Sequence, residues 1–204
     1  MLFLTSCARL TADVQNFSIL PLDYVGKRLA VLGYPEKINK SLEWNSYKPV
    51  FEKQFRKQGF VISSLDNADY VAFVTYGIGD PQTSTHIGSV PVYGQTGGGT
   101  TTHSGTVSSY YSGGYASYYG TSYTMPTYGV VGTSTYSYDA TSYTRTVAIN
   151  LVEKGSNKKL FEGKVTSTGP CSMIGEVIDE IAESMFQKFP SGSGRVVVKA
   201  EADC

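Results

Sequence analysis

The chain has few of the residues that catalytic and metal sites usually need. Its 204 residues include two histidines, three cysteines and one tryptophan, and the formal net charge is zero. Nucleophilic catalysis requires a base within reach of the nucleophile, and the chain contains no G-x-S-x-G and no H-E-x-x-H segment. Nucleic-acid binding usually requires a basic patch. We therefore expect a non-enzymatic protein with no cofactor, no metal and no nucleic-acid partner.

Long hydrophobic runs and, in the middle of the chain, charged residues are also scarce. No segment approaches the ~20 apolar residues that cross a bilayer. Between Gly77 and Thr144 there is no Lys, Arg or Glu, and Asp80 and Asp139 are the only acidic residues. Gly, Ser, Thr and Tyr dominate this segment, which holds 11 of the 16 tyrosines. The change in composition predicts a separate, inserted part of the molecule.

The first residues carry a targeting motif. Leu4-Thr5-Ser6-Cys7 is typical of a bacterial lipobox, in which a signal peptidase cleaves before a cysteine that becomes acylated. Residues 1–6 would then be the remnant of a signal peptide. Its earlier part would be missing either because the true start codon lies farther upstream or because the chain is a truncated fragment. More than one acyl chain gives stable anchoring, so an acylated Cys7, carrying palmitate-like chains, would tether the protein to a membrane. The alternative is a cytosolic protein that happens to begin this way.

The cysteine count fits an exported protein. Acylation of Cys7 leaves Cys171 and Cys204, which in an oxidising compartment are candidates for a disulfide. Such a bond would hold residue 204 near the start of the last helix. The alternative is two free thiols.

Hydrophobic patterns outside the uncharged segment predict strands and two amphipathic helices. Apolar runs favour strands over residues 28–34 and 69–76, and a helix beginning near Ser46, because proline at position 49 suits only the first turn. Farther along, the patterns predict a hairpin over 146–165, a helix over 174–189 and a strand over 195–200. We therefore expect an α+β fold: a two-layer sandwich with a mixed or antiparallel sheet of about five strands and two helices on one face.

The expected domain organisation follows from these elements. Residues 7–27 form a lipidated tether, residues 28–76 and 144–204 form the α+β domain, and residues 77–143 are inserted. The inserted segment contains two similar stretches, at residues 91–97 and 126–132, each followed by a Ser/Thr-rich run. This repetition predicts a β-hairpin arm with a mobile tip at residues 108–123, and the alternative is a disordered low-complexity loop.

Tyrosines of the arm are the candidate binding surface. Three interpretations remain open: association with a protein or a second copy, since tyrosine favours protein contacts; stacking on a neutral glycan; or a spacer without a ligand. His86 and His103, with Asp80, could form a metal site, but two solvent-facing polar side chains are the simpler interpretation. The candidate tyrosines are Tyr93, Tyr110, Tyr111, Tyr115, Tyr118, Tyr119, Tyr123 and Tyr128.

The chain resembles a family of bacterial envelope lipoproteins. The resemblance rests on Cys7, residues 44–60, the Ala-Asp-apolar strand at 68–74, the hairpin at 147–165 and the Phe189-Pro190 pair that closes the last helix. Those proteins have a small α/β domain of unknown function, and the resemblance covers residues 28–76 and 144–190. It implies a periplasm-facing lipoprotein, with Ala8 resembling the outer-membrane sorting pattern, and it implies no activity. The expected function is a lipid-anchored interaction or structural module; the alternative is a glycan- or peptidoglycan-binding lipoprotein.

Overall fold

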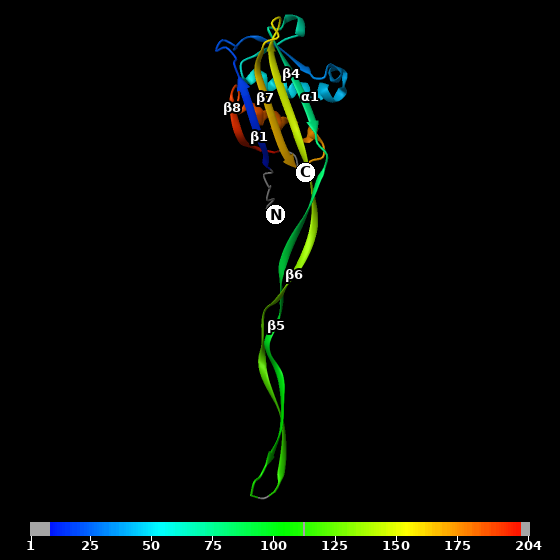
Figure 1. The fold of residues 1–204 in the computed structure, drawn as a ribbon, viewed down its shortest axis with the longest axis vertical. Helices are drawn as coiled ribbons and strands as arrows, with labels where there is room; N and C mark the ends of the chain where they lie inside the picture. The colour runs from blue at the N-terminus through cyan, green and yellow to red at the C-terminus, as the bar shows by residue number, and fades with distance from the viewer. Residues whose placement is uncertain (1–8, 112, 201–204) are drawn as a thin grey trace, which may run out of the picture. The chain divides into compact units, whose positions relative to one another are not determined.

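The computed structural model describes residues 9–111 and 113–200, which divide into two compact units. The first unit comprises Met1–Thr83 and Thr141–Cys204, and the second comprises Ser84–Ala140. The strands are β1 (Arg9–Ser18), β2 (Arg28–Gly33), β3 (Val61–Ile62), β4 (Tyr70–Ile78), β5 (Gln82–Ser108), β6 (Tyr115–Glu153), β7 (Lys159–Gly169) and β8 (Gly192–Lys199); the helices are α1 (Leu42–Lys57) and α2 (Ile178–Phe186), with short 3-10 turns η1 (Glu36–Lys40), η2 (Leu65–Asn67) and η3 (Ile174–Glu176) (Figure 1).

The expected α+β sandwich with about five strands is wrong. The structure is 59% strand and 19% helix. Within the described residues, eight strands form one mixed sheet in the order β3-β2-β4-β6-β7-β1-β8, with β5 paired to β6. The three strands beyond the five expected are β1, which lies where the sequence predicts a tether, the two-residue strand β3, and β5, which runs through the inserted segment.

β1 is an integral strand of the sheet. It pairs in antiparallel fashion with β7 on one side and with β8 on the other. Its residues alternate between buried and exposed, and the buried set includes Leu10, Ala12 and Val14. Asn16 continues this buried set, and its Nδ2 donates a hydrogen bond to the carbonyl of Met185 at 2.8 Å. Residues 9–18 are therefore part of the core, not a tether.

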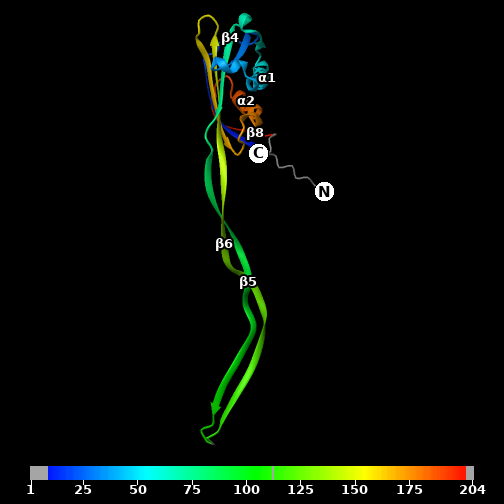
Figure 2. The same ribbon diagram turned by 90° about the vertical axis from the view of Figure 1, so that its right-hand side faces the viewer.

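The helices cover one face of the first unit's sheet, as Figure 2 shows. β2 pairs in parallel with β3 and β4, and the remaining pairs with described register are antiparallel. α1 packs on β2 and β3, α2 packs on β1, β7 and β8, and the two helices contact each other. Phe55 of α1 is fully buried between them, with its ring 4.8 Å from that of Phe186. This aromatic contact joins the two halves of the core.

α1 begins earlier than the sequence predicts. Its first residue is Leu42, and the Oγ of Ser41 accepts a hydrogen bond from the Trp44 amide at 3.0 Å, which is an N-cap. Pro49 therefore lies inside the helix, not in its first turn. The helix tolerates it because Trp44, Phe51 and Phe55 are anchored in the core, and tertiary packing outweighs local propensity.

The second helical segment is shorter than the predicted helix over residues 174–189. It begins with η3, and α2 itself spans only Ile178–Phe186. The apolar stripe is nevertheless buried, since Ile174, Ile181 and Met185 are at most 6% exposed. A 3-10 turn continues the same stripe because it also returns a side chain to one face every three residues.

An ion pair at the edge of the first unit links β2 to β4 and gives a pH-dependent prediction. Hydrogen bonds from the side chain and amide of Arg28 lower the pKa of Asp69 from 3.8 to about 2. Because the folded pKa lies below the unfolded one, the pair stabilises the fold above pH 3.8, and this contribution is lost as the pH falls toward about 2. We expect Asp69→Asn to flatten the acid limb of stability against pH in urea unfolding.

The matched control is Asp80→Asn, which removes a carboxylate outside this pair. Equal slopes for wild type and Asp69→Asn between pH 4 and pH 2 would contradict the assignment of the low pKa to Asp69.

Candidate functional site

The second unit, called the arm here and defined as residues 84–140, is a two-stranded ribbon. Contacts that link the two strands pair early residues of β5 with late residues of β6, so the ribbon is antiparallel. Thr85 Oγ1 donates to Asp139 Oδ1 at 2.7 Å, and His103 Nε2 lies 2.9 Å from Ser122 Oγ. Only residues 109–114 connect the strands, so the turn is shorter than the tip predicted at residues 108–123.

All the tyrosines that the sequence singles out lie on the arm, and all are exposed. One belongs to β5, two to the turn and five to β6. Their exposed fractions range from 57% to 100%. The structure thus brings them onto one ribbon without burying them. They are Tyr93; Tyr110 and Tyr111; and Tyr115, Tyr118, Tyr119, Tyr123 and Tyr128.

Glycines of β5 make room for tyrosines of β6. A Cβ added at Gly105 would lie 2.6 Å from the ring of Tyr118, and one at Gly88 would collide with the ring of Tyr136. Each ring therefore covers the backbone of the opposite strand at a glycine, an arrangement known to support glycine in sheets. The mixed Gly/Tyr composition is a cross-strand packing pattern, and it gives the ribbon internal contacts.

The two histidines of the arm are engaged in local contacts. His86 stacks on Tyr138 with ring centroids 5.3 Å apart, and Tyr138 stacks in turn on Tyr136 at 6.2 Å. His103 contacts Ser122. Among the described residues, no three His, Cys, Asp or Glu side chains gather in a way that could hold a metal ion.

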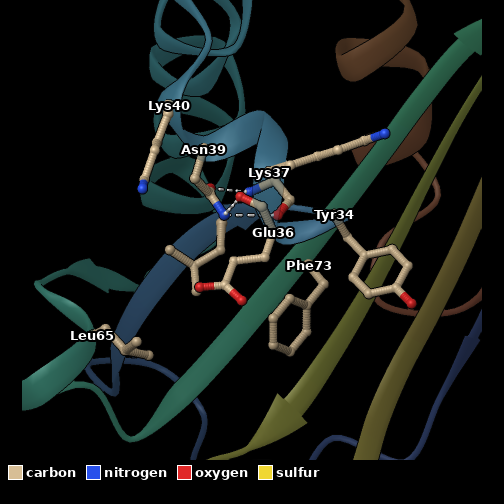
Figure 3. A pocket seen from close by; sticks show the side chains of 9 residues that line it. Tyr34, Glu36, Lys37, Asn39, Lys40, Leu65 and Phe73 are labelled. Atoms are coloured by element: carbon tan, nitrogen blue, oxygen red, sulfur yellow. Dashed lines mark hydrogen bonds between the residues drawn. The ribbon is translucent and has the colours of Figure 1, made fainter.

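Sequence reasoning missed a groove on the first unit beside β2 and β4 (Figure 3). Its volume is about 840 Å³. Tyr34 and Phe73 form an edge-on aromatic pair there, at 6.5 Å between ring centroids. The side chain of Asn39, which also lines the groove, accepts a hydrogen bond from the Gly33 amide at 2.7 Å and donates one to the Gly33 carbonyl at 3.0 Å. The described residues that line the groove are Leu32, Gly33, Tyr34, Glu36, Lys37, Asn39, Lys40, Leu65 and Phe73.

The structure describes one of the three cysteines, Cys171. Cys171 is 7% exposed and disulfide-bonded. Cys7 and Cys204, the other cysteines of the chain, lie outside the described residues. Acylation of Cys7 and pairing of Cys171 with Cys204 therefore stay predictions.

Most of the chain matches one protein family. Residues 13–191 match the model of the family described as "Domain of unknown function (DUF4136)". The chain belongs to this family. The match includes β1 from its fifth residue, both helices and the whole arm, so the DUF4136 domain covers most of the chain. Membership carries no activity, because the family is defined without one.

Solved structures with a similar fold are distant from this DUF4136 protein. A PDZ domain protein from Parabacteroides distasonis shares 12% identity at a TM-score of 0.43, over 93% of this chain and 38% of that chain. A PelC dodecamer from Paraburkholderia phytofirmans shares 14% identity at a TM-score of 0.39, over 87% of this chain and 93% of that chain. The chain thus spans well under half the length of the first of these proteins. No curated protein matches the sequence.

No described helix of the DUF4136 protein combines the length and the apolar character that crossing a membrane requires.

Proposed function

We propose that this DUF4136 protein is a non-enzymatic, lipid-anchored envelope protein whose arm binds a protein partner, a second copy of the chain included. The arm supplies the binding surface, and the first unit supplies a stable base. The lipid anchor is Cys7, supported by the lipobox Leu4-Thr5-Ser6-Cys7.

The observation that carries this proposal is the exposure of aromatic side chains on a ribbon of only two strands. An isolated two-stranded hairpin is at best marginally stable in water, and exposed strand edges can pair with other chains. Tyr93, Tyr119, Tyr123 and Tyr128 are 70–76% exposed. Tyrosines in such positions contribute large, rigid contact areas at interfaces. A partner would bury them and stabilise the ribbon at the same time.

The charge of the arm supports the same conclusion. Asp139 is the only Asp, Glu, Lys or Arg among residues 84–140, and its carboxylate already accepts a hydrogen bond from Thr85. Charged residues are depleted in the cores of protein interfaces. The same lack of charge suits a neutral glycan, which is the alternative ligand, and a hollow of about 370 Å³ beside Tyr118 and Tyr119 offers a place for it.

The test removes the exposed rings and keeps the packed ones. We expect wild type to associate in a concentration-dependent manner in sedimentation velocity, and the quadruple variant to associate at least tenfold more weakly, since interface aromatics often contribute about 2 kcal/mol each. Circular dichroism checks that the strands persist. The substitutions are Tyr93→Ser, Tyr119→Ser, Tyr123→Ser and Tyr128→Ser.

A matched control removes four exposed apolar side chains of the first unit and should associate like wild type. Unchanged association of the tyrosine variant would contradict the proposal. A monomeric wild type that binds a neutral oligosaccharide saturably, with loss of binding in the tyrosine variant, would favour the glycan alternative. The control substitutions are Leu22→Ser, Tyr34→Ser, Leu42→Ser and Met173→Ser.

A further inference from the structure

A buried arginine lies in β6 of the first unit. Arg145 of β6 pairs with Ile78 of β4 and with Ser167 of β7. It has the same position in the strand alternation as Val147 and Ile149, which are fully buried core residues. Only 2% of Arg145 is exposed. Its side chain therefore stands on the core face of the sheet.

The charge of Arg145 is not balanced within the described residues. Its Nε is buried without a hydrogen-bond partner, and none of the ion pairs found among residues 9–111 and 113–200 includes it. Burial lowers the pKa of Arg145, and the charge of Glu176 opposes this effect only in part. A buried charge without a partner is strongly unfavourable, so an anion at this position would stabilise the fold.

A small cavity adjoins the guanidinium. Its volume is about 130 Å³, enough for several waters or one small anion. Gly169 lies at its wall, where an added Cβ would be 2.7 Å from Arg145 Nη2 and would displace the guanidinium from its present position. The disulfide-bonded Cys171 forms another part of the wall. Ser167 and Ala200 also line the cavity.

We propose that the Arg145 cavity binds a carboxylate group. The planar guanidinium matches the two oxygens of a carboxylate in a bidentate pair. A carboxylate adds one negative charge near Glu176, whereas a phosphate dianion would add two. This site is independent of the arm.

Two sources can supply the carboxylate. One is the sequence that follows Ala200, which contains Glu201 and Asp203. The other is a separate molecule. Both sources present the same carboxylate group to Arg145, and the experiment distinguishes between them.

The experiment follows the Nε–Hε resonance of Arg145 in ¹⁵N-labelled full-length protein with its disulfide intact. Arg145→Lys identifies the resonance, and backbone-to-side-chain correlations identify it if that variant does not fold. Sodium acetate is titrated against sodium chloride at equal ionic strength. The resonance of Arg195, an exposed arginine paired with Asp13 at 3.0 Å, is the internal control. The same titration is run on Glu201→Gln/Asp203→Asn.

A saturable shift of the Arg145 resonance with acetate in wild type, absent with chloride and absent at Arg195, supports a carboxylate from a separate molecule. A resonance that responds to acetate only in Glu201→Gln/Asp203→Asn supports a carboxylate from this chain. An Arg145 resonance that acetate leaves unchanged in both proteins overturns the proposal.

Discussion

Phe55→Ala is expected to lower the free energy of unfolding by about 3–5 kcal/mol, a large part of the ~5–15 kcal/mol that stabilises a typical domain. Phe55 is fully buried. Its ring contacts Phe60 at 5.6 Å and Phe186 at 4.8 Å, both edge-on. The substitution leaves a cavity at the contact between α1 and α2, where neither helix can move inward without losing its contact with the sheet. Urea unfolding followed by tryptophan fluorescence measures the loss.

The matched control is Phe17→Ala. Phe17 is 63% exposed at the end of β1, and exposed substitutions usually change stability by about 0.5 kcal/mol or less. Equal losses for the two variants would show that the aromatic cluster around Phe55 is not the centre of the core.

The aromatic cluster also shows how far the sequence predicts the fold. The spacing of Trp44, Phe51 and Phe55 indicates a helix with one buried face, and these three side chains are buried. The predicted helix start near Ser46 is wrong, because the helix begins after the N-cap residue Ser41 and accommodates Pro49 in its interior. Tertiary packing, which a single sequence does not display, decides between such signals.

β1 illustrates a signal that was present in the sequence. Leu10, Ala12, Val14 and Asn16 alternate with polar or exposed residues over the whole strand. Alanine and asparagine at buried positions weaken the hydrophobic contrast between the two faces of the strand. The position directly after the lipobox favours a tether as the interpretation of these residues. The strand is buried because it lies between β7 and β8, and pairing of segments so far apart in the sequence leaves no local trace.

The two candidate sites also differ in how far the sequence reveals them. Composition alone marks the tyrosines of the arm, and the structure leaves them exposed. Arg145 shares the alternation of Val147 and Ile149, but a charged residue at the end of an apolar strand usually indicates the point where the strand leaves the core. Its guanidinium packs against Gly169, which lies on a different strand.

Cys7→Ala is expected to move the protein from the membrane fraction to the soluble fraction. The chain is expressed in a bacterium behind a complete signal sequence, with Ser6→Ala, which keeps a small residue before the cysteine, as the matched control. Wild type and Ser6→Ala should sediment with membranes and carry a diacylglycerol and an N-linked acyl group in the intact mass. Removing these chains removes about 0.8 kcal/mol of membrane affinity per buried methylene.

The disulfide of Cys171 gives a second way to test whether Cys7 is acylated. The chain has only Cys7 and Cys204 as other cysteines, and a cysteine whose sulfur carries a diacylglycerol cannot also form a disulfide. Acylation of Cys7 therefore requires that Cys171, if its bond lies within one chain, pairs with Cys204, and non-reducing peptide mapping should find that pair in wild type and in Cys7→Ala alike. A peptide that joins Cys171 to Cys7, together with an unacylated soluble wild type, would contradict both the anchor and the pairing, because one sulfur atom cannot serve both bonds.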